Sequence, residues 1–77
     1  MTKRLKETEF VIFCIENVAK KLNKSGAEVY QELKRLDAIE GLLYASYETL
    51  HTQSKDYIVD EVIRTMNEWK GQAPKMN

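Results

Sequence analysis

The sequence has few of the residues that usually carry chemistry or covalent cross-links. Among its 77 residues it holds a single cysteine, Cys14, and a single histidine, His51. No disulfide can form within the chain, and a lone cysteine without CxxC spacing fits a reducing cytosol better than a secreted scaffold. We therefore expect a cytoplasmic protein. Cys14 lies inside an apolar run with no base placed beside it, so we expect a core thiol rather than a nucleophile.

Long apolar segments and glycine motifs are also absent. The longest apolar run, residues 10–15, has six residues, whereas a membrane-spanning helix needs roughly 20 and the core of a signal peptide about 7 to 15. We therefore expect neither membrane insertion nor export. The three glycines stand apart at positions 26, 41 and 71, so the sequence contains no glycine-rich loop of the kind that binds nucleotide phosphates.

What the chain does contain is apolar residues at helical spacing. Four residues in the segment 7–22 recur at i, i+4, i+7 and i+11, which places them on one face of a first helix. They are Val11, Ile15, Val18 and Leu22. The apolar run at 10–15 could by itself be a strand, but the stripe continues well past it, so we favour a helix.

The second and third helices are predicted from capping signals followed by apolar stripes. Ser25 and Glu28 have the spacing of a capping box, which predicts a helix start after Ser25. Asp37 and Glu40 repeat that spacing, so we expect Asp37 to cap a third helix over residues 38–50. The two apolar stripes consist of Val29, Leu33 and Leu36, and of Ile39, Leu42, Leu43, Tyr47 and Leu50.

A fourth helix is predicted from Ser54 to about residue 70. Ser54 is the expected N-cap, and Asp60 and Arg64 have the spacing of an intrahelical ion pair. Its apolar stripe is Ile58, Val62, Met66 and Trp69. We therefore predict an all-α fold, a compact bundle of four helices with no sheet. It forms a single domain over residues 1–70, followed by a disordered tail at 71–77 that contains a glycine and a proline.

No residue pattern indicates catalysis or a bound metal ion. His51 with Asp56 and Asp60 could be drawn as a metal site, but one histidine provides no HxxxH or HExxH motif. Ser46 and Ser54 do not lie in a nucleophile-elbow sequence. We therefore expect a non-enzymatic protein with no catalytic residues, no metal and no cofactor.

Nucleic-acid binding would have to rely on a local basic patch. The 12 Lys and Arg residues balance the 12 Asp and Glu residues, so the chain lacks the overall positive charge of most nucleic-acid binders. A patch is possible at the junction of the first two helices, where five cations lie close together in sequence. They are Lys20, Lys21, Lys24, Lys34 and Arg35. The predicted third helix carries no Lys or Arg, which disfavours base reading by that helix.

The aromatic residues favour protein contacts instead. Phe13 and Tyr57 lie opposite the apolar stripes of their helices, and Tyr44 lies at the edge of its stripe. Such rings are enriched in protein interfaces. Burial in a small bundle that surrounds the first helix is the alternative for each of them.

Three segments resemble a family of short bacterial proteins of unknown function. They are EFVIFCIENVAKK, GAEVYQELKRL and YETLHTQSKDYIVDEV. The most specific match is the family's "LHT, then YIV and an acid" pattern, carried by Leu50, His51 and Thr52 and by Tyr57, Ile58, Val59 and Asp60. The resemblance implies no activity.

That resemblance implies an accessory or antitoxin-like binding role. Relatives tend to be small genes beside other uncharacterised genes, some of which look like ADP-ribosyltransferase-type toxins. We therefore expect a protein-binding module that regulates the product of a neighbouring gene, with a homodimer also possible. The alternative is a nucleic-acid-binding regulator that uses the basic patch.

Overall fold

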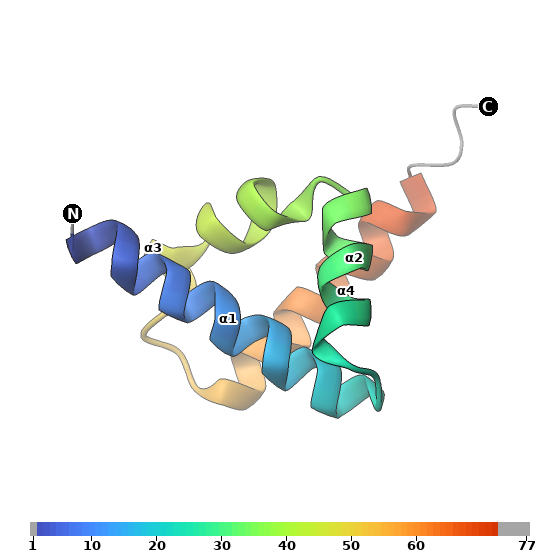
Figure 1. The fold of residues 1–77 in the computed structure, drawn as a ribbon, viewed down its shortest axis with the longest axis horizontal. Helices are drawn as coiled ribbons and strands as arrows, with labels where there is room; N and C mark the ends of the chain where they lie inside the picture. Colours follow the sequence, from blue (N-terminus) through green and yellow to red (C-terminus); the bar gives the residue numbers. More distant parts are fainter. Residues whose placement is uncertain (1, 73–77) are drawn as a thin grey trace.

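All regular structure in the described part of the chain is helical (Figure 1). The computed structural model describes residues 2–72. The helical segments, in chain order, are α1 (Thr2–Leu22), α2 (Gly26–Arg35), the π-helix η1 (Ile39–Tyr44), α3 (Tyr47–Leu50) and α4 (Lys55–Gln72). The predicted all-α class is confirmed for residues 2–72. The predicted count of four helices is wrong, because η1 and α3 replace the single helix expected at 38–50.

The turn between α1 and α2 follows from local backbone chemistry. Asn23 has a φ of 59°, a left-handed conformation that Asn adopts more readily than most residues. The Lys24 amide donates to the Ala19 carbonyl at 2.9 Å, which completes a Schellman ending. Ser25 then caps α2: its hydroxyl accepts from the Glu28 amide at 3.1 Å, and the Glu28 carboxylate accepts from the Ser25 amide at 2.8 Å. The predicted capping box is confirmed.

Asp37 ends α2 instead of starting the next helix. Its φ is 60°, and its amide donates to the Lys34 carbonyl at 3.0 Å. Asp shares with Asn a tolerance for this left-handed conformation, so the residue serves as a helix stop. The expected N-cap role is wrong, since Ala38 precedes η1 and no side chain caps that helix.

The π-helix explains why the predicted third helix is broken. The Ala45 amide donates to the Glu40 carbonyl, five residues earlier, at 3.2 Å, which is the π-helical spacing. The wider turn brings the adjacent residues Leu42 and Leu43 into the core together. A regular α-helix then resumes at Tyr47 and lasts a single turn.

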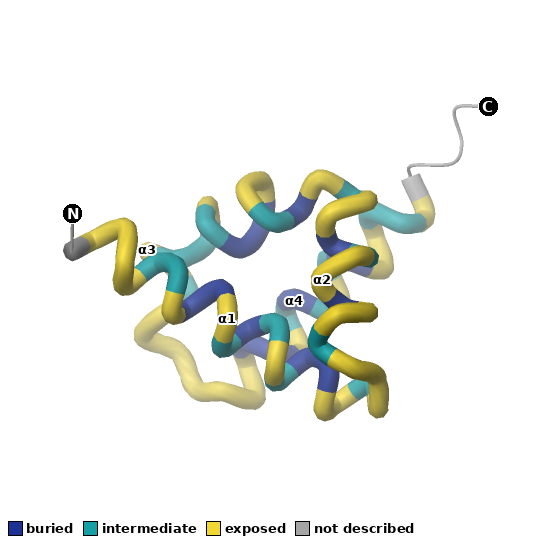
Figure 2. Tube along the Cα trace, viewed as in Figure 1, coloured by how far each residue is buried: buried dark blue, intermediate teal, exposed yellow. Residues whose placement is uncertain are grey.

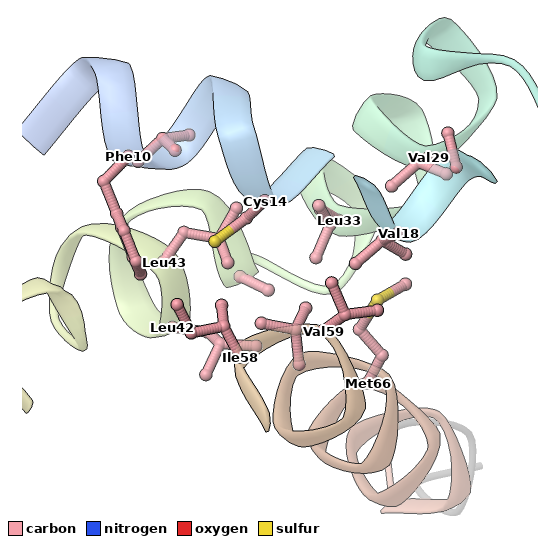
Figure 3. Close-up of a cluster of buried hydrophobic side chains, with 14 residues drawn as sticks. Phe10, Cys14, Val18, Val29, Leu33, Leu42, Leu43, Ile58, Val59 and Met66 are labelled. Atoms are coloured by element: carbon pink, nitrogen blue, oxygen red, sulfur yellow. The ribbon is translucent and has the colours of Figure 1, made fainter. Parts of the chain in front are cut away.

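The core is organised around α1, which contacts α2, η1 and α4. Figure 2 shows buried segments on each of these elements, and Figure 3 shows their side chains meeting in one cluster that includes Cys14. Cys14 is fully buried, which confirms the predicted core thiol. The cluster consists of Phe10, Val11, Cys14, Val18, Ala19, Val29, Leu33, Ala38, Leu42, Leu43, Ile58, Val59, Val62 and Met66.

The start of α4 agrees with its predicted cap, but the ion pair predicted within this helix does not form. The Ser54 hydroxyl accepts from the Tyr57 amide at 3.2 Å, as expected for an N-cap. The predicted pair of Asp60 with Arg64 is wrong, because Arg64 binds Glu61 and Glu68, each at 2.7 Å.

The helix α4 continues beyond its predicted end. It includes Gly71 and Gln72, the first two residues of the predicted tail, and residues 73–77 lie outside the described residues. Within residues 2–72, no helix has the length and apolar character needed to cross a membrane.

Candidate protein-binding surface

A shallow hollow lies between α1 and the chain that leads from α3 into α4. Its volume is about 440 Å³, within the usual size range of small-molecule pockets. We call it the aromatic hollow, and its lining residues are Lys6, Glu9, Phe10, Phe13, Tyr47, His51, Gln53 and Ile58. Its lining combines apolar side chains with charged and amide groups.

Stacked and edge-on rings build one side of the aromatic hollow. The rings of Phe10 and Tyr47 meet edge to face, with centroids 5.5 Å apart and an angle of 82°. The Tyr47 ring is stacked on the His51 imidazole at 4.3 Å and 12°. His51 Nδ1 lies 2.7 Å from the Tyr47 carbonyl oxygen. Because a carbonyl oxygen only accepts, Nδ1 carries the proton in this bond.

The three aromatic residues singled out from the sequence occupy different environments. Phe13 is half-buried and lines the aromatic hollow. Tyr57, in the first turn of α4, remains 48% exposed. Tyr44 is half-buried and engaged within the chain: its hydroxyl lies 2.9 Å from the Thr8 hydroxyl, and the Arg4 guanidinium lies 3.9 Å from its ring centroid. Only Phe13 among them lines the aromatic hollow.

The predicted basic patch is divided between two hollows. Lys20 and Lys21 line a hollow of about 240 Å³ between the end of α1 and the start of α4, together with Lys55. Lys24 and Arg35 line a separate hollow on α2. The second hollow is also lined by Glu28 and Glu32, and the first by Asp56 and Asp60.

Acidic neighbours reduce the positive charge of this patch. Lys21 lies 3.7 Å from the Asp60 carboxylate, and Lys24 lies 3.4 Å from the Glu32 carboxylate. Glu32 also binds Lys70, and the hydrogen bond from Lys70, supported by Lys24, lowers the pKa of Glu32. Lys34 is exposed.

The "LHT, then YIV and an acid" segment forms the turn from α3 into α4. Leu50 is half-buried at the end of α3, and His51 follows as its C-cap. Thr52 is exposed. Ile58 and Val59 belong to the core, whereas Asp60 reaches Lys21 on α1. The segment therefore combines core packing, helix capping and one wall of the aromatic hollow.

Sequence reasoning missed several residues of the aromatic hollow. Tyr47 was assigned only to an apolar stripe, although its spacing of four residues from His51 allows the two rings to stack on one helix face. Lys6, Glu9 and Gln53 gave no signal, because their place at the hollow depends on how α1 packs against the α3 to α4 turn.

Two further observations concern reactive groups. Burial raises the pKa of the Cys14 thiol to about 12, so at neutral pH it is protonated and shielded from solvent. In the part of the chain that the structure describes, His, Cys, Asp and Glu side chains form no group of three that could hold a metal ion.

A comparison with known protein families identifies the family of this chain. A family model described as "Protein of unknown function (DUF3791)" matches residues 9–69, which includes most of the aromatic hollow and all of the turn from α3 into α4. The chain belongs to the DUF3791 family. Its predicted resemblance to a family of small uncharacterised proteins is thereby confirmed. No curated protein and no solved structure matches this DUF3791 chain.

Proposed function

We propose that this DUF3791 chain is a small non-catalytic protein-binding module, an accessory or antitoxin-like regulator of a neighbouring gene's product in a bacterial cytoplasm. The observation that carries the proposal is the aromatic hollow. Two chain segments far apart in sequence, α1 and the turn from α3 into α4, place Phe10, Phe13 and the Tyr47–His51 stack around one concave surface. Aromatic residues in such positions are typical of interface centres.

The hollow can receive one large apolar side chain of a partner. Full burial of a Leu or Phe side chain contributes roughly 1.5 to 3 kcal/mol, enough to make it the anchor of a modest interface. Lys6, Glu9 and Gln53 line the same hollow and provide charges and an amide for hydrogen bonds that select the partner's flanking residues. Tyr57, which is 48% exposed, adds a second candidate contact. Tyr44 is the weakest of the three candidates, because its ring is covered by Arg4 of α1 and does not line the hollow.

The test is capture of a partner followed by mutation of the hollow. Tagged protein is purified from its native host after nuclease treatment, and co-purifying proteins are identified by mass spectrometry. We expect one stoichiometric protein partner, whose affinity falls at least tenfold in Phe13→Ala. Gln53→Ala changes an exposed residue of the aromatic hollow, and Tyr57→Ala changes the second candidate contact outside it, both without disturbing the core. Tyr30→Ala, at a tyrosine 41% exposed on α2, is the matched control.

Two results would overturn this proposal. The first is a preparation that contains no stoichiometric partner. The second is a partner whose affinity is the same for the wild-type protein and for Phe13→Ala, Gln53→Ala and Tyr57→Ala, once circular dichroism shows that each variant is folded.

A second proposal, a nucleic-acid-binding regulator, is supported by the hollow at the end of α1. The structure brings Lys55 to the same hollow as Lys20 and Lys21, which raises the local density of cations beyond what the sequence spacing indicated. This proposal predicts retention on DNA that weakens steeply with salt, because bound cations displace counterions from phosphates. It also predicts weaker retention for Lys20→Gln/Lys55→Gln. Salt-independent retention, or none at low salt, would contradict it.

A further inference from the structure

The outer face of α1 carries two exposed apolar side chains. Leu5 is 59% exposed and Ile12 is 50% exposed, whereas the opposite face of α1 supplies the centre of the core. Helical spacing places Leu5, Glu9, Ile12 and Glu16 in one row, since successive members are three or four residues apart. We call this row the outer strip. In the described part of the chain four large apolar residues remain exposed, and two of them, Leu5 and Ile12, lie on this row.

The two glutamates of the outer strip differ from the three acids that pair with the first turn of α1. Glu7, Glu40 and Glu48 are all paired with Arg4 or Lys3, at 3.0 to 3.8 Å. Glu9 and Glu16 are exposed, and among the ion pairs of the described residues neither takes part. The outer strip therefore alternates apolar and unneutralised acidic groups, one turn apart.

We propose that the outer strip docks an amphipathic helix of another protein, with Lys or Arg alternating with apolar residues along its contact face. The inference rests on the proposed protein-binding function and specifies the partner's chemistry. Apolar residues of the partner cover Leu5 and Ile12, and its cations pair with Glu9 and Glu16. Helix docking of this kind reads side chains at one-turn spacing, and complementary charge fixes the register.

A second copy of the chain fits the outer strip less well. An antiparallel pair of α1 helices that sets Glu9 against Lys20 of the second copy places Leu5 opposite position 24, beyond the end of that helix at Leu22. Setting Leu5 against Ile12 of the second copy places Glu9 opposite Thr8, which carries no charge. Lys20 follows Glu16 by four residues and ends the acidic part of the strip. A helix of another protein can therefore pair an acidic residue with Lys20.

The first experiment uses designed peptides as probes. Two fluorescent helical peptides of about 18 residues, close to the length of α1, present Leu alternating with Lys or Leu alternating with Glu at one-turn spacing. Anisotropy titrations against the full chain measure binding. We expect the Leu/Lys peptide to bind at least tenfold more tightly than the Leu/Glu peptide, and more weakly as salt rises. Equal affinities would overturn the proposal.

Variants then locate the site. Glu9→Gln/Glu16→Gln should weaken the Leu/Lys peptide at least fivefold, and Glu9→Lys/Glu16→Lys should transfer the preference to the Leu/Glu peptide. Gln31→Lys/Asn67→Lys raises the net charge by the same amount as the double glutamine variant, at exposed positions on α2 and α4, and is the matched control. Leu5→Ser/Ile12→Ser should also weaken binding. If the control weakens binding as much as the glutamine variant, the strip is not the site.

Two outcomes separate this inference from the proposed function. A native partner that depends on Phe13 but binds normally to Leu5→Ser/Glu16→Lys, two positions that do not line the aromatic hollow, leaves the protein-binding function standing and overturns the outer strip. Concentration-dependent dimerisation in analytical ultracentrifugation, abolished by Leu5→Ser/Ile12→Ser, identifies a second copy as the occupant and also overturns it.

Discussion

His51 is fixed to Tyr47, one turn earlier, by two contacts at once. The two rings are stacked with centroids 4.3 Å apart, and His51 Nδ1 lies 2.7 Å from the Tyr47 carbonyl oxygen. The Tyr47 carbonyl also accepts from the His51 amide at 2.9 Å, so two bonds from His51 reach back to the first residue of α3, a helix of four residues that has little stability of its own. The only histidine of the chain therefore closes a helix while it also lines the aromatic hollow.

The Tyr47–His51 contact should be measurable as a coupling energy. We expect a double-mutant cycle of Tyr47→Ala and His51→Ala to give about 0.5 to 1.5 kcal/mol, the range for stacked ring pairs. Urea unfolding of the four proteins provides the free energies. A parallel cycle of His51→Ala with Tyr30→Ala, on α2, should give no coupling. A zero value for the first cycle would mean that the stack adds nothing to stability.

The two serines at Ser25 and Ser46 should respond differently to the same substitution. Both precede a helix, but only Ser25 accepts a side-chain cap bond. Ser25→Ala should lower the free energy of unfolding by about 1 kcal/mol, whereas Ser46→Ala should change it by less than about 0.5 kcal/mol. Chemical denaturation measures both. Equal losses would show that the capping bond is not the cause.

Cys14 should be unreactive in the folded protein. Burial leaves no exposed area on this residue and raises the pKa of its thiol to about 12, so the reactive thiolate is scarce at about pH 8. We expect slow labelling by a disulfide reagent in buffer and rapid, complete labelling in concentrated urea. Rapid labelling of the folded protein, at the rate of a free thiol, would contradict the described burial.

Glu32 should give the protein a stability increment that depends on pH. Its hydrogen bond with Lys70, assisted by Lys24, lowers the pKa of Glu32 in the folded state below the unfolded value of about 4.3. The increment is therefore complete above the unfolded pKa and is lost as the pH falls through the folded pKa. Glu32→Gln should lower the free energy of unfolding by about 0.5 to 1 kcal/mol at neutral pH.

The test of Glu32 is urea unfolding of the wild-type protein and the variant across the acid range. The difference between them should shrink as the carboxyl becomes protonated. Glu68→Gln, which removes an exposed partner of Arg64, is the control and should have a smaller effect. A difference that stays constant between neutral and strongly acidic pH would show that charge at Glu32 is not involved.

The helix starts could be predicted because their causes are local. Ser25 and Ser54 bond to amides three residues away, so the sequence pattern contains the whole interaction. Asp37 shows the limit of that logic, because the same residue type caps a helix start and tolerates the left-handed turn that ends one. Its surroundings in the fold decided between the two roles.

The break at η1 could not be predicted from apolar spacing. Residues 39–50 have a stripe compatible with one α-helix, whereas the wider turn that buries Leu42 and Leu43 together forms where η1 packs against α1 and α2. The aromatic hollow could not be predicted from the sequence either, because tertiary contacts bring Phe13 and His51 to it. The exposure of Leu5 and Ile12 likewise depends on which side of α1 the later helices cover.

The central position of α1 also determines when the domain can form during synthesis. This helix leaves the ribosome before α2, η1 and α4, yet those three elements are the ones that cover its apolar face. Val18 and Cys14 therefore have no complete set of neighbours until α4 has been translated. A nascent chain that stops before α4 exposes the apolar face of α1 to chaperones and proteases. Chaperones and proteases can thus recognise a truncated chain by the exposed apolar face of α1, the helix that is synthesised first.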